Sequence, residues 1–293
     1  MTAPGLTSPR RAAVVGHPVA HSLSPLLHGT AYAALGLDGW RYDRLDVLPE
    51  DLPALLASLD DGWAGLSVTM PHKHALLDLV DHVDPLARVV GAANTVLLQP
   101  GRTRPQLVAL NTDVHGLVTA LAEGLGTADR ADGRRGVVLG GGATAASALA
   151  GLAQLGVTEA DVVVRSPGRA GALLRAAERM GLHPHLRAWS TATDLLPAAD
   201  VVVSTLPAHG ADELAQALAA AAVPCRGVLL DCAYDPRPTA LGTAWSAVGG
   251  TAVGGERMLL HQAVEQVRLM TGRPAPLAVM DDALTRHLVG TGA

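Results

Sequence analysis

Short runs of aliphatic and β-branched residues alternate along the chain with longer stretches rich in Ala and Leu. The short apolar runs suit buried strands, and the Ala/Leu stretches are long enough for helices that cover them. Such alternation is typical of an α/β protein with a mostly parallel sheet. It predicts strands at residues 12–16, 66–69, 95–98, 107–110, 136–139, 161–164, 200–204 and 227–231.

Capping residues and glycines mark the ends of several helices. Ser24 followed by Pro25 is typical of an N-cap with proline at the first helical position, and Gly36 is placed to end that helix. Asp84 and Pro85 give the same signal for a helix to about residue 90. Similar rules predict a hairpin turn over 101–105, a surface loop over 124–133, a domain boundary near 113, and helices after Asp113, over 256–271 and over 276–288.

Composition narrows the class of protein. A length of 293 residues suggests two domains or one large one, and 49% hydrophobic against 17% charged residues is too apolar for a disordered chain. The net charge of −5 provides no basic surface for nucleic acid. Aromatic residues make up only 2% and Phe is absent, so the core is expected to consist of Ala, Val and Leu.

Neither export nor membrane insertion is indicated. The two cysteines, Cys225 and Cys232, fit neither a disulfide framework nor a zinc site, which favours a reducing cytoplasm. Residues 1–11 lack the basic-then-apolar order of a signal peptide. The longest uncharged run, 136–158, is interrupted by glycines and polar residues, so a buried strand, turn and helix explain it better than a membrane span.

A glycine-rich motif points to a dinucleotide. It follows a predicted strand, opens a predicted helix and matches G-x-G-x-x-A, a pattern in which small residues permit a tight turn, close approach of backbone amides to a pyrophosphate and helix packing. The helix N-terminus adds unpaired N–H groups for the anion. A plain turn in a chain with 32 glycines is the alternative. The motif consists of Gly140, Gly141, Gly142, Ala143, Thr144 and Ala145.

The end of the next strand discriminates between the two nicotinamide dinucleotides. An acidic residue there would bind the ribose hydroxyl of NAD, whereas arginine favours the 2′-phosphate of NADP. The strand ends at Arg165, with Arg169 four residues later and no Asp or Glu nearby. The alternatives are therefore a clamp for the NADP phosphate or two solvated arginines.

Polar residues gather where strands of the first half end. The carboxyl ends of strands face one crevice in an α/β sheet, so these side chains are expected to converge on a small polyhydroxylated ligand. Lys73 suits an oxyanion, and a neighbouring Asp113 would help to orient it. A helix cap, a strand residue and a solvated lysine remain the alternatives for single members. The set comprises Ser22, Ser24, Ser67, Thr69, Lys73, Asn94 and Asp113.

The histidines do not suggest a metal site. His72 and His74 flank Lys73, and His183 and His185 form a second pair, but none belongs to an H-E-x-x-H motif. We expect them to be surface residues. No G-x-S-x-G motif for an acyl-transfer serine is present.

Several of these motifs together resemble the shikimate dehydrogenase family, and the resemblance covers nearly the whole chain. Residues 16–25 resemble its G-x-P-x-x-H-S-x-S-P opening, and 67–73 resemble N-V-T-x-P-x-K. Further matches are 91–95 to G-A-x-N-T, 111–116 to N-T-D-x-x-G, 231–236 to D-x-x-Y-x-P, 255–262 to G-x-x-M-L-x-x-Q and the two arginines to N-R-T-x-x-R.

The resemblance implies a fold, an activity and a set of site residues. It implies an N-terminal α/β substrate domain over 1–113, to which C-terminal helices over 255–293 return, and a Rossmann-type NADP-binding domain over 114–254. It implies catalysis by Lys73 and Asp113. Substrate contacts would come from Ser22, Ser24, Ser67, Thr69, Asn94, Tyr234 and Gln262. Cofactor contacts would come from residues 140–145, Arg165, Ser166, Arg169, Thr205, Gly255 and Met258.

Three positions depart from the family pattern. Ser67 stands where the family has Asn, which shortens a substrate contact or routes it through water. Val164 replaces an asparagine and removes a polar contact to the adenosine end. Glu256 and Arg257 occupy an otherwise apolar or neutral part of the last motif, and the sequence suggests no reason for them.

The resemblance implies reversible NADPH-dependent reduction of 3-dehydroshikimate to shikimate in aromatic amino-acid biosynthesis, by a monomer or homodimer. A related dehydrogenase acting on quinate or aminoshikimate is one alternative. A non-catalytic NADP-binding sensor is another, against which the presence of both Lys73 and Asp113 argues.

Overall fold

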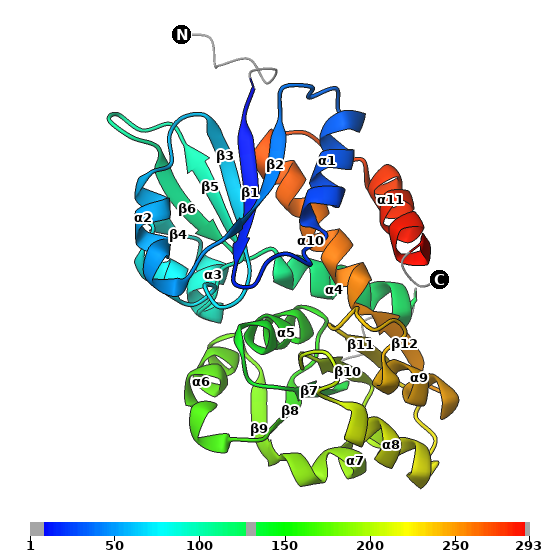
Figure 1. The fold of residues 1–293 in the computed structure, drawn as a ribbon. Coiled ribbons are helices and arrows are strands. Elements are labelled where there is room, and N and C mark those ends of the chain that lie inside the picture. The colour runs from blue at the N-terminus through cyan, green and yellow to red at the C-terminus, as the bar shows by residue number, and fades with distance from the viewer. Residues whose placement is uncertain (1–8, 127–132, 291–293) are drawn as a thin grey trace. The chain divides into compact units, whose positions relative to one another are not determined.

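The computed structural model describes residues 9–126 and 133–290, which form two compact units. The first unit runs to Thr112 and resumes at Gln262, and the second comprises Asp113–His261. Each unit contains one six-stranded sheet (Figure 1). The second boundary falls inside helix α10 (Gly255–Thr271), whereas the sequence places the return near residue 255.

The first unit contains a mixed sheet. Strands β1 and β3 run parallel, as do β1 and β2, whereas β5 is antiparallel to both β3 and β6. The carboxyl ends of β1, β3 and β6 therefore lie at the same edge as the amino end of β5 (Figure 1). In sheet order the strands are β2 (Arg41–Asp46), β1 (Arg11–Gly16), β3 (Trp63–Val68), β5 (Thr95–Gln99), β6 (Gln106–Leu110) and β4 (His82–Val83).

Helix boundaries in this unit agree with one capping prediction and contradict another. The Asp84 side chain accepts from Leu86 N at 2.9 Å at the start of α3, as expected. The prediction that Ser24 caps α1 is wrong, because the N-cap is Leu23 and Ser24 is already the first helical residue. The helices are α1 (Ser24–Ala34), α2 (Leu52–Ala57), α3 (Pro85–Val90), α11 (Leu277–Gly290), the end of α10, and the 3-10 turns η1 (Pro49–Asp51) and η2 (Ala75–Asp78).

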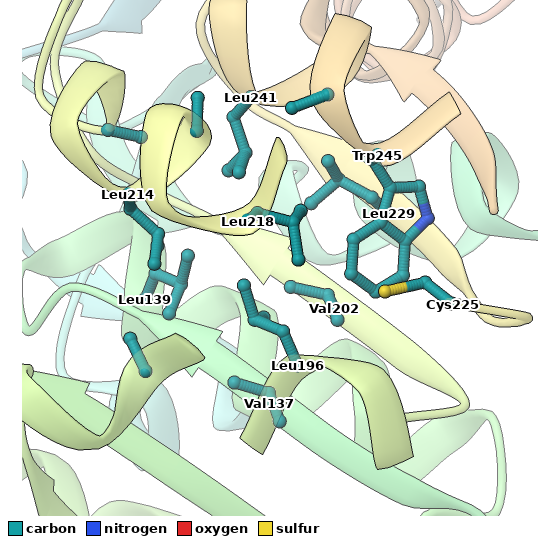
Figure 2. Close-up of a cluster of buried hydrophobic side chains, with 14 of the residues drawn as sticks. Val137, Leu139, Leu196, Val202, Leu214, Leu218, Cys225, Leu229, Leu241 and Trp245 are labelled. Carbon is teal, nitrogen blue, oxygen red and sulfur yellow. The ribbon is translucent and has the colours of Figure 1, made fainter. Parts of the chain in front are cut away.

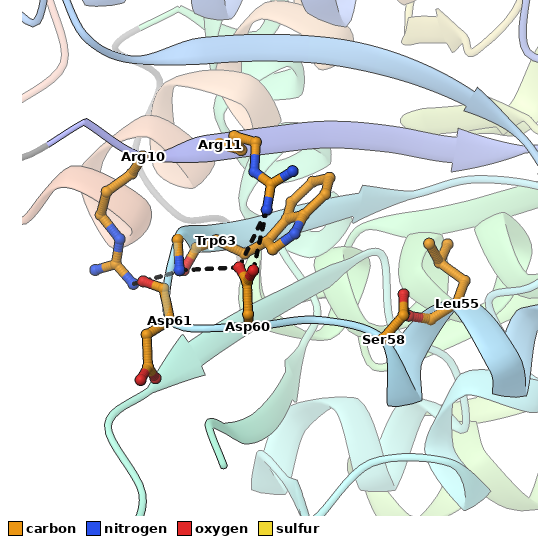
Figure 3. A network of polar contacts seen from close by, with 8 residues as sticks. Arg10, Arg11, Leu55, Ser58, Asp60, Asp61 and Trp63 are labelled. Atoms are coloured by element: carbon orange, nitrogen blue, oxygen red, sulfur yellow. Dashed lines mark hydrogen bonds and ion pairs between the residues drawn. The ribbon is translucent and has the colours of Figure 1, made fainter.

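Polar contacts hold the start of β1 to the turn that precedes β3 (Figure 3). The Arg11 guanidinium donates to both carboxylate oxygens of Asp60, at 3.1 and 3.3 Å, and lies 4.7 Å above the Trp63 ring. Asp60 also accepts from Gly62 N at 3.0 Å. These contacts are exposed, so they contribute little stability but help to align the two strands.

The second unit contains an entirely parallel sheet in the order β12-β11-β10-β7-β8-β9. This is the doubly wound order that reverses beside the first strand, between β7 and β10, and places ligands at the carboxyl ends there. The strands are β7 (Arg135–Leu139), β8 (Glu159–Val164), β9 (His183–Ala188), β10 (Val201–Ser204), β11 (Val228–Asp231) and β12 (Thr251–Gly254).

Helices connect these strands. They are α4 (Asp113–Leu125), α5 (Ala143–Gln154), α6 (Gly171–Arg179), α7 (Ala192–Leu195), α8 (Asp212–Ala221), α9 (Ala240–Ala247), the start of α10, and the turns η3 (Pro167–Arg169), η4 (Trp189–Thr191) and η5 (Leu196–Ala198). The loop expected over 124–133 begins inside α4, and its residues 127–132 lie outside the described residues.

One face of the parallel sheet packs against helices through an aliphatic core (Figure 2). Val202 and Leu229 project from neighbouring strands against Leu218 and Leu241 of helices α8 and α9. Trp245 is the largest fully buried side chain among the described residues, and its Nε1 donates to Gly227 O at 3.1 Å. The core is thus built mainly from Ala, Val and Leu, as the composition predicts.

No helix within 9–126 and 133–290 is long and apolar enough to span a membrane.

Candidate functional site

Polar residues predicted from the first half of the chain lie at the end of the first sheet where β1, β3 and β6 finish. Strand pairing places Ser67 opposite Thr95, and Thr95 opposite Leu110, so the segments that follow β3 and β6 leave the sheet beside the start of β5. Thr69, Asn94 and Thr112 therefore come from neighbouring strands although they are distant in sequence. Carboxyl ends of strands are where α/β folds place ligand-binding side chains.

A glycine makes this edge possible at β1. A Cβ on Gly16 would lie only 2.3 Å from Thr69 Cγ2, which is too close for both atoms, and 3.0 Å from Met70 O. Thr69 N donates to Val15 O at 2.9 Å, which holds the two strand ends together. The loop carrying Thr69 thus rests on β1 because residue 16 has no side chain.

Ser22 and Ser24 lie where the chain turns from β1 into α1. Ser22 Oγ accepts from Ser24 N at 3.3 Å, and Arg44 donates to Ser22 O at 2.8 Å through one terminal nitrogen. Ser24 is 5% exposed, whereas Ser22 is half-buried. Two hydroxyls beside a helix N-terminus and an arginine are suited to a carboxylate.

Asn94 makes several hydrogen bonds with the segments around it. Its Oδ1 accepts from Thr112 N at 2.7 Å, and its Nδ2 donates to Thr112 Oγ1 at 2.9 Å and to Gln262 Oε1 at 3.4 Å. Asn94 and Gln262 are both buried. The fold therefore brings together two residues that the sequence separates by 168 positions.

Ser67 belongs to a buried polar network whose other members the sequence analysis missed. Tyr42 Oη donates to Ser67 Oγ at 2.5 Å, and Ser67 Oγ donates to Gln266 Oε1 at 2.6 Å. Gln266 is fully buried and also contacts His28 Nε2 at 3.3 Å. The i, i+4 spacing of Gln262 and Gln266 places them one helical turn apart on one face, which is a signal that could have revealed Gln266.

Burial fixes the charge state of this network. His28 is fully buried, and desolvation lowers its pKa to about 3, so the imidazole is neutral at working pH. Its ring stacks on Tyr42 with centroids 4.0 Å apart. Burial also raises the pKa of Tyr42 above its ordinary value, although hydrogen bonds with Ser67 and Ser24 oppose that rise. The whole network is therefore uncharged.

Lys73 lies in the turn after β3. It is half-buried, and its carbonyl accepts from Ala93 N at 2.9 Å, which ties this turn to the segment before Asn94. It is the only lysine in the sequence. All other residues in the Lys+Arg total are arginines. Arginine stays protonated at all working pH values, so Lys73 is the one such side chain able to give up a proton.

The neighbours of Lys73 correct one expectation. His72 is not a surface residue: it is 1% exposed and its Nε2 donates to Val47 O at 2.9 Å. His74 is exposed, as expected, and its Nδ1 contacts Gly91 O at 2.8 Å. The described parts of the chain contain no cluster of His, Cys, Asp or Glu placed to hold a metal ion.

Two of the predicted catalytic and substrate-binding residues belong to the second unit. Asp113 is its first residue, opens α4 and is 4% exposed. Tyr234 lies in the loop after β11 and is half-buried, and burial, followed by the charge of Asp235, raises its pKa. The pairing of Asp113 with Lys73, and the approach of Tyr234 to a substrate, stay predictions.

The glycine motif lies at the carboxyl end of β7, beside the reversal of strand order. Gly140 has φ +114°, and a Cβ there would lie 2.4 Å from Thr205 Oγ1, which itself donates to Leu139 O at 2.9 Å. Gly142 is the N-cap of α5, is exposed, and has open space where a Cβ would be. Exposed backbone amides at the start of a 12-residue helix suit a pyrophosphate.

Arg165 is exposed at the end of β8 and is held by two contacts. One terminal nitrogen donates to Gly210 O at 2.9 Å, and the guanidinium carbon lies 5.3 Å from the centre of the Trp189 ring. Its other N–H groups suit a phosphate, and Ser166 beside it is exposed. The side chain of Arg169, in η3, lies outside the described residues.

The structure accounts for Val164. Val164 is buried, and a Cβ on Gly141 would lie 3.2 Å from its Cγ1. The valine therefore packs beneath the glycine turn.

The structure also accounts for the charged pair at the start of α10. Arg237 Nε donates to Glu256 Oε1 at 3.0 Å, which ties the loop after β11 to this helix. Arg257 makes a bidentate ion pair with Glu123 of α4, both bonds being 2.7 Å long, and this pair lowers the pKa of Glu123. Gly255 permits this packing, since a Cβ there would lie 2.3 Å from Cys232 O. Met258 is buried on the same helix.

Comparison with known proteins identifies the relatives of the chain. Residues 14–96 match the family model described as the shikimate dehydrogenase substrate binding domain, and residues 255–285 match the shikimate 5′-dehydrogenase C-terminal domain. A protein of Methanothermobacter thermautotrophicus named shikimate dehydrogenase (NADP(+)) is 34% identical over 282 residues, which cover 94% of this chain and 95% of that one.

Solved structures agree. Shikimate dehydrogenase of Mycobacterium tuberculosis is 41% identical, with a TM-score of 0.83 over 95% of this chain and all of that one. Quinate dehydrogenase of Corynebacterium glutamicum, solved with NAD, is 27% identical, with a TM-score of 0.82 over 95% of this chain and 99% of that one. Identity above 30% across nearly the full length of both chains shows that the chain belongs to the shikimate dehydrogenase family.

Proposed function

We propose that the protein catalyses the reversible NADPH-dependent reduction of 3-dehydroshikimate to shikimate, a step in the biosynthesis of aromatic amino acids. The observation that carries this proposal is the buried hydrogen bond between Asn94 and Gln262, next to the turn in which the carbonyl of Lys73, the only lysine of the chain, accepts from Ala93 N. In this assignment the first unit binds the substrate and the second binds the cofactor.

The residues of the first unit suit each part of the substrate. Ser22 and Ser24 hold its carboxylate, and Asn94 and Gln262 bind ring hydroxyls, because an amide can both donate and accept. The remaining contacts in this proposal come from Ser67 and Thr69 of the first unit and from Tyr234 of the second.

Lys73 acts as the general acid. NADPH, when bound, supplies the hydride that reduces the ketone carbon. As that carbon–hydrogen bond forms, the carbonyl π electrons move to oxygen, and the Lys73 ammonium donates its proton there. Lys73 then takes a proton back from water. Asp113 orients Lys73 and accepts from a substrate hydroxyl.

The second unit fits NADP on its own features. Gly141 and Gly142 are exposed at a helix N-terminus, where a pyrophosphate would bind. The end of β8 carries Arg165 and no carboxylate, which suits a 2′-phosphate and not a free ribose hydroxyl. In this proposal, Ala143–Ala145, Ser166, Thr205, Gly255 and Met258 complete the site.

Initial rates provide the direct test of this function. Loss of reduced cofactor is followed with 3-dehydroshikimate and either NADPH or NADH, and the reverse reaction with shikimate or quinate. The proposal expects fast turnover with NADPH and shikimate. Absence of turnover despite tight NADPH binding would contradict it and favour the non-catalytic sensor.

A quinate dehydrogenase is the second candidate, because the Corynebacterium relative of that name has a similar structure. An aminoshikimate dehydrogenase would be tested in the same way. The absence of an acidic residue after β8 argues against NAD, which that relative carries. Faster turnover of quinate with NAD than of shikimate with NADP would establish the second candidate.

Arg165→Ala is expected to raise the Kd for NADPH by about 10- to 100-fold, which is the loss of about 1.5–3 kcal/mol from charge-assisted hydrogen bonds. The Kd for NADH should change little, because NADH lacks the 2′-phosphate. Fluorescence titration of both cofactors measures this. Arg187→Ala is the matched control, since Arg187 pairs with Asp161 on neighbouring strands. An equal loss for both cofactors would remove Arg165 from the phosphate site.

Small molecules are therefore the partners in this proposal. We also propose a cytoplasmic location, supported by Cys225 and Cys232, neither of which is in a disulfide. The protein would be a monomer or a homodimer, and sedimentation would distinguish the two.

A further inference from the structure

The orientation of Gln266 follows from its neighbours. Asn94 O, a backbone carbonyl that can only accept, lies 3.2 Å from Gln266 Nε2. This contact identifies Nε2 as the amide nitrogen, which also donates to Thr95 Oγ1 at 2.9 Å. Gln266 Oε1 therefore faces Ser67 and His28 as an acceptor, so every hydrogen-bonding position of this fully buried amide is used.

The direction of every further bond follows from Gln266. Because Oε1 has no proton, the Ser67 hydroxyl must donate its only proton to Gln266, over 2.6 Å. Ser67 can then only accept from Tyr42, so Tyr42 donates. The Tyr42 proton is thereby committed to Ser67. His28 donates to Gln266 as the neutral Nε2–H tautomer.

We propose that Gln266 is a positioning residue that sets substrate specificity by committing the Ser67 proton, so that Ser67 offers the substrate only an acceptor. A hydroxyl oxygen has two lone pairs, and one of those on Ser67 is used by Tyr42. The remaining lone pair selects a substrate group that donates, such as a ring hydroxyl, over one that only accepts.

This inference rests on the proposed function, because Ser67 is assigned to the substrate by the resemblance to the family. The inference also gives a reason why position 67 is serine and not the asparagine of the family pattern. The side chain of Gln266 reaches Ser67 from α10 and fills the space beyond its hydroxyl. Position 67 lacks the amide of the family's asparagine, and Gln266 of α10 supplies an amide instead. This amide accepts the Ser67 proton and so controls the direction of the Ser67 hydrogen bond.

Fluorinated ligands test the direction of this bond. Each ring hydroxyl of shikimate is replaced in turn by fluorine, which cannot donate, and the Kd of each analogue is compared with that of shikimate by calorimetry. The ring position that faces Ser67 is the one at which the Ser67→Ala variant no longer binds shikimate more tightly than the fluorinated analogue. At that position the natural protein should bind shikimate about 5-fold tighter than the fluorinated analogue, as expected for one neutral hydrogen bond.

Two variants separate positioning from general damage. Gln266→Leu releases the Ser67 proton. The ratio of the Kd for the fluorinated analogue to the Kd for shikimate, at the ring position that faces Ser67, should then fall below about 2-fold. Asn94 O keeps its bond from Val68 N at 2.7 Å in that variant, which limits the structural damage. Tyr42→Phe is the matched control, because it breaks the same network but leaves the Ser67 proton on Gln266. Its ratio should stay near 5-fold.

The outcomes are distinct. Loss of discrimination in Gln266→Leu alone supports the inference. Equal loss in Tyr42→Phe, an unchanged ratio in Gln266→Leu, or no discrimination by the natural protein at any position sensitive to Ser67→Ala would overturn it. A lack of discrimination by the natural protein would overturn the inference even if Gln266→Leu does not fold. Absence of any shikimate binding or turnover would instead overturn the proposed function itself.

Discussion

Lys73→Ala is expected to lower kcat for 3-dehydroshikimate reduction by about 10²- to 10⁴-fold, the usual cost of losing a general acid. KM should change little, because the substrate keeps its contacts with the serines and amides of the sheet edge. A loss of kcat without a change in KM is the signature of an interaction made only in the transition state. Steady-state rates at saturating NADPH measure both constants.

Lys73→Arg is the control for charge. Arginine preserves the positive charge but cannot release a proton at working pH, so kcat should stay close to that of Lys73→Ala. Recovery of most activity in Lys73→Arg would show that the positive charge suffices and would remove Lys73 from the role of acid. A loss confined to KM would do the same.

Trp245→Ala is expected to lower the free energy of unfolding of the second unit by about 3–5 kcal/mol, as for other large aromatic side chains truncated in a core. The indole is fully buried in the cluster shown in Figure 2 and donates to Gly227 O. Its removal leaves a cavity and takes one of two hydrogen bonds from Gly227 O, which keeps its bond from Thr251 N at 3.1 Å. Urea unfolding followed by circular dichroism measures the loss.

Trp245→Phe separates these two effects. Phenylalanine keeps most of the volume but cannot donate, so this variant should lose mainly the hydrogen bond, about 1 kcal/mol. A cost below about 1 kcal/mol for Trp245→Ala would mean that the surrounding helices collapse into the space. NADPH binding in the folded variant reports whether the glycine loop is disturbed.

Much of the fold could be predicted from the sequence. All eight predicted strands exist, and each lies inside a sheet, with a neighbour on both sides. The four strands that were not predicted are the outermost strands of the two sheets, namely β2, β4, β9 and β12. Inner strands are covered on both faces and so read as continuous apolar runs, whereas edge strands such as Arg41–Asp46 and His183–Ala188 are partly exposed and carry mixed residues.

The sequence by itself also determined the glycine turn, the arginine after β8 and the polar residues at the strand ends, because each depends on local backbone geometry or on residue chemistry. Only the tertiary structure decided which of those residues contact one another. Tyr42 and Gln266 reach Ser67 from 25 and 199 positions away, and no periodicity spans such distances. Their selection follows from burial, since a polar group removed from water must find its partner wherever the packing of the chain places one.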